Sequence, residues 1–239
     1  MTDALFAIGD IHGQAEALDD ALGRVSRLAD GAAIVFIGDY IDRGPDSRGV
    51  IDRLMDGQAE GRRWICLQGN HDTFLGAFLD GPDAEMPEDW IGPRWLSDPF
   101  GGRETLASYG VDVDPRRAID AVRADALEAV PRAHRDWLDA RPRMHKTDDH
   151  IFVHAGIRPG IALALQDPED LIWIRHEFLD DPRDHGRLVV HGHTPGPAPM
   201  LFPNRLNLDG GAGYGRALDP VRLLGREAVL IGSGGEVRL

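Results

Sequence analysis

The sequence contains a single cysteine, Cys66, among its 239 residues. One cysteine excludes a disulfide within the chain and indicates a reducing compartment, so we expect a cytoplasmic protein. Cys66 stands in the apolar stretch RWICLQ, which favours a buried thiol over a nucleophile.

Long apolar runs and an excess of positive charge are also missing. No run approaches the roughly 18 apolar residues that a membrane-spanning helix requires. The stretch MTDALFAIGD has no basic segment, so we expect no signal peptide. The formal net charge of −14 argues against a basic surface for nucleic acid or acidic membranes. An anionic substrate remains open, because bound divalent cations reverse the local field.

The first third of the chain repeats one pattern three times. A short apolar stretch runs into glycine and a polar cluster, and stretches with helical spacing of apolar residues separate the repeats. The apolar stretches are LFAI (5–8), AIVFI (33–37) and WICL (64–67). Asp10, Asp39 and Asn70 follow at intervals of 29 and 31 residues, about the length of a βαβ unit. Because parallel strands bring their carboxyl ends to one edge of a sheet, we expect the polar clusters to converge there.

The rest of the chain predicts a helical insert and then more strands. Residues from about 81 to 143 are rich in Pro, Gly and Trp and then read as two helices broken at Pro131. Trp90, Trp95 and Trp137 line a substrate groove or, as we expect for at least two of them, pack the insert onto the sheet. Five later stretches read as strands: HIFVHAG (150–156), RLVVHGH (187–193), RLNLDGG (205–211), VRLLG (221–225) and AVLIG (228–232). We expect the last three to be antiparallel, and we interpret residues 1–239 as one α/β domain that includes the insert.

Polar residues at the predicted strand ends form a candidate metal site. Carboxylates, imidazoles and an amide without thiolates suit Mn, Fe or Zn better than a cysteine-rich structural zinc site. Their number exceeds what one ion needs, and two ions that share a carboxylate suit displacement at phosphorus. The candidate residues are Asp10, His12, Asp39, Asp42, Arg43, Asn70, His71, His154, His191 and His193.

Each of these residues also has a simpler interpretation. Asp10 or Asp39 alone would cap a following helix, and Arg43 alone would be a surface ion-pair partner. The stretch LVVHGHTPG contains two histidines, His191 and His193, and side chains two residues apart point to the same side of a strand. Geometry therefore allows His191, His193 or both as ligands.

Five motifs in order carry a resemblance to a known family. They are GDIHG, GDYIDRG, GNHD, HAG and GHTP, supported by LIWIR (171–175) and GGRETLASYG (101–110). The chain resembles the phosphoprotein phosphatase branch of the calcineurin-like metallophosphoesterases, in particular its compact bacterial and phage members. The resemblance implies a β-sandwich of mixed sheets flanked by helices.

The resemblance also implies residue roles. Asp10 and His12 would bind one divalent cation, Asn70, His154 and His193 a second, and Asp39 would bridge the two. His191 would support the site or the fold. Mn²⁺ is favoured, with Fe or Zn as alternatives. Water would attack phosphorus directly while Arg43 and Arg175 hold phosphoryl oxygens, His71 protonates the leaving oxygen and Asp42 holds the His71 ring. Arg175 has the alternative of pairing with Asp170 or Glu177.

Three positions bear on the substrate. Pro195 replaces the last histidine of the GHxH pattern of related nucleases, which argues against a nuclease. Asp72 stands where the protein phosphatases of this branch usually carry Glu, and Phe100 where similar chains tend to have Asn.

We therefore predict a phosphomonoesterase of the protein serine/threonine phosphatase type, acting on phosphorylated protein or a small phosphoester. A symmetrical dinucleoside polyphosphate hydrolase is the alternative, supported by GNHD and HAGI. A metal-binding scaffold for a phosphorylated ligand ranks last, because no catalytic residue is missing. The oligomeric state is not predicted.

Overall fold

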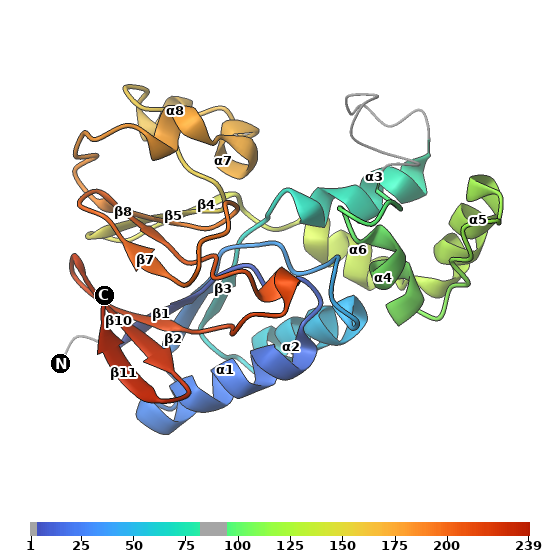
Figure 1. Ribbon diagram of the computed structural model, residues 1–239, viewed down its shortest axis with the longest axis horizontal. Helices are drawn as coiled ribbons and strands as arrows, with labels where there is room; N and C mark the ends of the chain where they lie inside the picture. Colours follow the sequence, from blue (N-terminus) through green and yellow to red (C-terminus); the bar gives the residue numbers. More distant parts are fainter. Residues whose placement is uncertain (1–3, 82–94) are drawn as a thin grey trace.

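A computed structural model describes residues 4–81 and 95–239. Within this part of the chain, two β-sheets stack face to face and helices cover their outer faces (Figure 1). The first sheet has the strand order β11-β10-β9-β1-β2-β3 and the second the order β4-β5-β6-β8-β7. The strands of the first sheet are β1 (Leu5–Ile8), β2 (Ala33–Phe36), β3 (Trp64–Cys66), β9 (Val221–Leu224), β10 (Glu227–Gly232) and β11 (Gly235–Arg238). Those of the second are β4 (Met144–Lys146), β5 (His150–Val153), β6 (Leu188–His191), β7 (Met200–Leu201) and β8 (Arg205–Asn207).

Helices lie in three places around the sheets (Figure 1). The first sheet is covered by α1 (Ala15–Leu28) and α2 (Ser47–Ala59), and the second by α7 (Asp170–Trp173) and α8 (His176–Leu179). A group at one side of the sandwich contains α3 (Phe74–Asp80), α4 (Gly102–Ser108), α5 (Ile119–Ala129) and α6 (Arg132–Asp139). The short 3-10 helices are η1 (His71–Thr73), η3 (Leu163–Leu165) and η4 (Ala212–Tyr214).

The alternation of side chains along each strand divides the core into layers. In β2, Ile34 and Phe36 pack toward the helices, whereas Val35 enters the layer between the sheets. In β6, Val190 enters the same middle layer, whereas Val189 packs in the layer that contains Phe178 of α8. Because both faces of these strands are buried, their sequences are continuous apolar runs rather than alternating ones.

The structure confirms the predicted α/β sandwich with mixed sheets and a helical insert. Strands β1, β2 and β3 are parallel, as are β5 and β6. Helices α5 and α6 are separated at Pro131 as predicted. Trp95 and Trp137 are buried, while Trp90 lies outside the described residues.

One prediction about the strands was wrong. We expected three antiparallel strands at the end of the chain, but β8 lies in the second sheet, where it pairs parallel with β6 and antiparallel with β7. All three of its residues are buried, and Leu206 packs in the layer between the sheets. Only β9 and β10 are antiparallel as predicted, and they continue into β11, a strand of exposed residues that the apolar pattern does not reveal. In the described part of the chain, no helix has the length and apolar character needed to cross a membrane.

Candidate metal centre

The predicted site residues lie directly after strands of both sheets. In the first sheet Asp10 follows β1 and Asp39 follows β2, and in the second His154 follows β5. Backbone hydrogen bonds tie the loops together, since the His12 N–H donates to the Asp39 carbonyl at 2.8 Å and the Gly192 N–H to the His154 carbonyl at 2.8 Å. Between the sheets, the His193 N–H donates to the Oδ2 of Asp10 at 3.1 Å, so both sheets present their carboxyl-terminal loops to a common place.

The backbone of this site is unusual. Among the described residues, the non-glycine residues with positive φ are all predicted site residues. Left-handed φ is uncommon for residues with a side chain, and such strain gathers at functional sites. These residues are His12, Asp39, Asp42, Arg43 and His193, with φ between 51° and 75°.

Asp39 lies at the centre of the cluster. Its Oδ2 is 3.5 Å from the Nε2 of His12, and its Oδ1 is 3.4 Å from the Nε2 of His154. Two groups of possible ligand atoms share this carboxylate, one with His12 and His71 and the other with His154 and His193, and the atoms of each group lie within 4.8 Å of one another. Burial by itself raises the pKa of the Asp39 carboxyl, but the positive charge that His154 and the other surrounding histidines take up in acid brings it below its usual value.

Three histidines direct the Nε2 of their rings toward this cluster. The Nδ1 of His12 lies 2.8 Å from the Ile41 carbonyl and that of His154 lies 3.0 Å from the Ile37 carbonyl. A carbonyl only accepts, so Nδ1 carries the hydrogen and Nε2 keeps its lone pair. The Nε2 of His193 is buried without a hydrogen-bond partner.

Burial keeps these imidazoles neutral. It lowers the pKa of His12 and His154 and brings that of His193 to about 2. A neutral imidazole is the form that binds a metal ion. The donors present therefore fit a divalent cation, which would also give the buried His193 nitrogen its missing partner.

Carboxylates gather at the same place. Asp10 accepts the backbone N–H of His193 at 3.1 Å, and burial, followed by the charges of Asp209 and Asp39, raises its pKa. Burial, with Asp39 adding to it, also raises the pKa of Asp209 to about 6. Asp209 was missed from the sequence, although it follows β8 in RLNLDGG as Asp10 follows β1. Its position strengthens the preference of this site for cations.

The structure does not reproduce the predicted ligand sets in every detail. Asn70 lies beside a predicted ligand of the same cation, with its Oδ1 2.9 Å from the Nε2 of His154. The group that contains His12 and Asp39, however, includes His71 rather than Asp10. Asp10 lies beside this group with its carboxylate turned to the His193 N–H.

His71, Asp42 and Arg43 form a connected set next to the cluster. The Nδ1 of His71 is 2.7 Å from the Oδ2 of Asp42, and its Nε2 is 3.0 Å from the Nη2 of Arg43. The Arg43 guanidinium also contacts the Nε2 of His12 and lies over the exposed ring of Tyr214 at 5.1 Å. Arg43 is thus directed into the site and is not a surface ion-pair partner.

Arg175 lies at the edge of the site. Its Nη1 donates to the Oγ1 of Thr194 at 3.3 Å, one residue beyond His193. Asp170, one of the alternative partners, instead pairs with Arg158 at 2.5 Å. The guanidinium of Arg175 therefore remains near the predicted ligands.

His191 points away from the cluster. Its Nε2 lies 3.3 Å from the Nη1 of Arg205, and its ring meets Phe178 edge to face at 5.2 Å. Burial lowers its pKa to about 3. His193, not His191, therefore lies with Asp39 and His154 at the candidate metal centre.

Comparison with known proteins identifies related sequences. The profile of the calcineurin-like phosphoesterase family matches residues 5–219. A symmetrical bis(5'-nucleosyl)-tetraphosphatase from Janthinobacterium sp. is 31% identical over 154 residues, which cover 64% of this chain and 44% of that protein. The asymmetrical bis(5'-nucleosyl)-tetraphosphatase PrpE from Oceanobacillus iheyensis is 25% identical over 250 residues, covering 95% of this chain and 91% of that protein. The chain thus spans less than half the length of the first relative and most of the second.

A solved structure shares the fold. The cold-active protein-tyrosine phosphatase of a Shewanella species matches with a TM-score of 0.63 and 16% identity, covering 99% of this chain and 80% of that chain. At this identity the match describes the architecture and not the substrate.

Proposed function

The chain belongs to the calcineurin-like phosphoesterase family, and on that premise we propose that it is a dinucleoside polyphosphate hydrolase that works with two divalent cations. The observation that carries the proposal is the position of Asp39, whose two carboxylate oxygens face different groups of imidazole nitrogens. The substrate class is supported by the two relatives that are bis(5'-nucleosyl)-tetraphosphatases. These names favour the alternative from the motifs over our first choice, a protein serine/threonine phosphatase.

The proposed metal ligands are the residues predicted from the motifs. Asp10 and His12 would hold one cation, Asn70, His154 and His193 would hold a second, and Asp39 would contribute to both. The mixture of carboxylate, imidazole and amide donors suits Mn²⁺, with Fe or Zn as alternatives. When bound, two such cations lower the pKa of a shared water and neutralise charge on the phosphoryl oxygens.

The chain's own residues bind the phosphate and transfer the proton. The guanidinium groups of Arg43 and Arg175 bind phosphoryl oxygens, for which their planar fork is suited. His71 donates a proton to the leaving phosphate oxygen as its bond to phosphorus breaks. Asp42 holds the His71 ring through the 2.7 Å contact with Nδ1.

Protein phosphatase activity is the second candidate. GDYIDRG and GHTP support it, because GHTP stands where dinucleoside polyphosphate hydrolases have a GHW-type sequence. A side-by-side substrate comparison separates the two candidates.

The test uses manganese-loaded protein with diadenosine tetraphosphate and, in parallel, a phosphoserine peptide. We expect a higher kcat/KM on the dinucleotide, and chromatography of the products then distinguishes symmetrical cleavage to two ADP from asymmetrical cleavage to ATP and AMP. On phenyl phosphate, whose phenolate leaving group needs a proton, His71→Asn should lower kcat by about 10²–10⁴-fold, whereas His176→Asn, whose side chain is exposed, should leave it unchanged. A preference for the peptide would establish the second candidate instead, and turnover of neither substrate would contradict both.

A further inference from the structure

The carboxylate of Asp42 is completely buried and takes hydrogen bonds from two side chains besides His71. Trp95 donates its indole N–H to Oδ2 at 2.9 Å, and Thr105 donates its hydroxyl to Oδ1 at 2.7 Å. Oδ2 is thus shared between His71 and Trp95. Hydrogen bonds to a charged group are shorter and stronger than neutral ones, so these donors fix the orientation of the carboxylate.

Thr105 also holds the backbone of Asp42. The Asp42 N–H lies 2.8 Å from the Oγ1 of Thr105 and 3.1 Å from the Oγ of Ser47. A threonine hydroxyl has one proton and two lone pairs, and an ionised carboxylate only accepts. Thr105 therefore gives its proton to Oδ1 and accepts from the N–H of the same residue. This double contact secures a residue whose φ of 75° is uncommon for a side-chain-bearing residue.

Both donors belong to the helical insert, which closes tightly on the loop of Asp42. The Arg43 N–H donates to the carbonyl of Gly101 at 3.2 Å, and a Cβ at Gly101 would lie 2.1 Å from that same nitrogen. A Cβ at Gly102 would lie 2.5 Å from the Trp95 ring. The indole is buried and packs on Phe78 at 5.1 Å between ring centres. Glycine at these two positions permits the close approach that brings Trp95 and Thr105 to Asp42.

We propose that Trp95 and Thr105 are positioning residues that hold Asp42, and through it the proton-donating ring of His71, in the orientation that the reaction needs. This inference rests on the proposed function of the site. It gives the insert a part in catalysis, because a carboxylate that loses one donor can rotate and no longer aligns the ring. A misaligned ring slows the hydrolysis of substrates whose leaving group needs a proton. It has little effect on the hydrolysis of substrates whose leaving group departs as a stable anion.

The kinetic test uses two aryl phosphates and the variants Trp95→Phe and Thr105→Val, which keep most of the packing volume. Phenolate resembles the tyrosine side chain, with a conjugate-acid pKa of about 10, and requires protonation, whereas p-nitrophenolate leaves without it. We expect kcat for phenyl phosphate to fall roughly tenfold and that for p-nitrophenyl phosphate about twofold at most, with KM unchanged. Equal losses on both substrates, or no loss, would overturn the inference.

Matched controls come from elsewhere in the chain. Trp137 is also buried and donates its indole N–H to Gln58 at 2.9 Å, and Thr147 lies beside His150. Trp137→Phe and Thr147→Val should leave the ratio of the two rates unchanged. A change in that ratio as large as in the Trp95 and Thr105 variants would show a general packing effect and overturn the inference.

A second measurement needs neither metal nor activity. In the metal-free protein, the indole N–H resonance of Trp95, assigned by its loss in Trp95→Phe, should move when Asp42→Asn removes the carboxylate charge, while that of Trp137 stays in place. An unchanged chemical shift of the Trp95 indole N–H in the Asp42→Asn variant would contradict the inference. A wild-type protein inactive on diadenosine tetraphosphate would instead contradict the proposed function, and the resonance would still decide the role of Trp95.

Discussion

Asp72 connects three backbone groups of the site loops. Its Oδ2 accepts the N–H of Asp39 at 2.9 Å and that of Gly69 at 2.7 Å, and its Oδ1 accepts the N–H of Tyr40 at 2.8 Å. The side chain is completely buried, so no water replaces these contacts. Asp72 thereby holds the loop after β2, which carries the central carboxylate Asp39, against the loop after β3.

Substituting Asp72→Asn should lower the free energy of unfolding by about 2 kcal/mol. An amide has one accepting oxygen and an NH₂ group, so at least one buried N–H loses its acceptor, which costs about 1–3 kcal/mol. Urea denaturation measures the loss. Asp19→Asn, at an exposed carboxylate paired with Arg53, is the control and should stay within about 0.5 kcal/mol of wild type. Equal stability of the two variants would show that Asp72 does not hold the loops.

The candidate site could be predicted from the sequence only where strand ends supply it. Asp10, Asp39 and His154 follow apolar runs, so their convergence follows from the sheet. The same reasoning applied to β8 would have found Asp209. It cannot find Trp95 or Thr105, because they lie 53 and 63 residues from Asp42 along the chain and meet it only through tertiary packing.

At the level of elements, strands that enter a buried layer were predictable, whereas the sheet that β8 joins and the exposed strand β11 were not. Runs such as AIVF in β2 and LVVH in β6 can be recognised as buried strands because they carry apolar residues on both faces. β8 has a single strongly apolar residue, Leu206. Its parallel pairing with β6 depends on a strand elsewhere in the chain, which the local sequence pattern does not reveal. The turns that separate it from its neighbours indicated antiparallel pairing, which it makes with β7 only.

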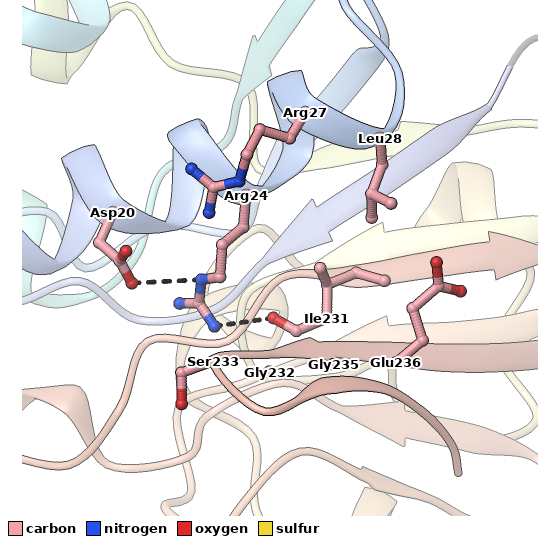
Figure 2. Close-up of a pocket in the computed structure, with 9 residues that line it drawn as sticks. All are labelled: Asp20, Arg24, Arg27, Leu28, Ile231, Gly232, Ser233, Gly235 and Glu236. Atoms are coloured by element: carbon pink, nitrogen blue, oxygen red, sulfur yellow. Dashed lines mark hydrogen bonds and ion pairs between the residues drawn. The ribbon is translucent and has the colours of Figure 1, made fainter.

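Arg24 holds α1 to the C-terminal hairpin, which is formed by β10 and β11, and to the residues just before β9 (Figure 2). Its Nη1 donates to the Asp219 carboxylate at 2.6 Å and to the Ile231 carbonyl at 2.7 Å, and its Nη2 donates to the Leu218 carbonyl at 2.6 Å. Asp20, one turn earlier on the same helix, lies 3.2 Å from Nε but is largely exposed. Arg24 itself is 7% exposed, so its hydrogen bonds are made away from water.

Substituting Arg24→Ala should reduce the free energy of unfolding by about 3 kcal/mol. The change leaves two carbonyls and a carboxylate without their donor, and breaking a buried charge pair costs about 3–5 kcal/mol, reduced here because Asp219 is partly exposed. Arg27→Ala removes another arginine of α1 beside the same hairpin (Figure 2) and should cost about 0.5 kcal/mol at most. Thermal or urea unfolding compares the variants, and equal losses would show that Arg24 does not clamp the hairpin.

The whole molecule carries a net charge of −14, and three of its carboxylates, those of Asp10, Asp39 and Asp209, are buried near one another at the centre of the site. Burial, and after it the repulsion between these carboxylates, raises the pKa of Asp10 and of Asp209, so both effects oppose folding in the metal-free protein. Both sheets contribute to this centre, so a cation bound there would join the two halves of the sandwich.

Manganese should therefore stabilise the entire fold. A ligand that binds only the native state stabilises it by about 2.7 kcal/mol at one hundred times its Kd, which for a chain of this size raises Tm by about 5–10 °C. Differential scanning fluorimetry with and without Mn²⁺, followed by reversal with a chelator, measures the shift. The His193→Ala variant should lose a large part of the rise in Tm, because the substitution removes the buried Nε2 that has no hydrogen-bond partner. The His176→Ala variant, changed at an exposed histidine, should keep the full rise. If His193→Ala gained as much stability from manganese as the wild type, the stabilising cation would have to bind elsewhere, and His193 would not belong to the second metal site.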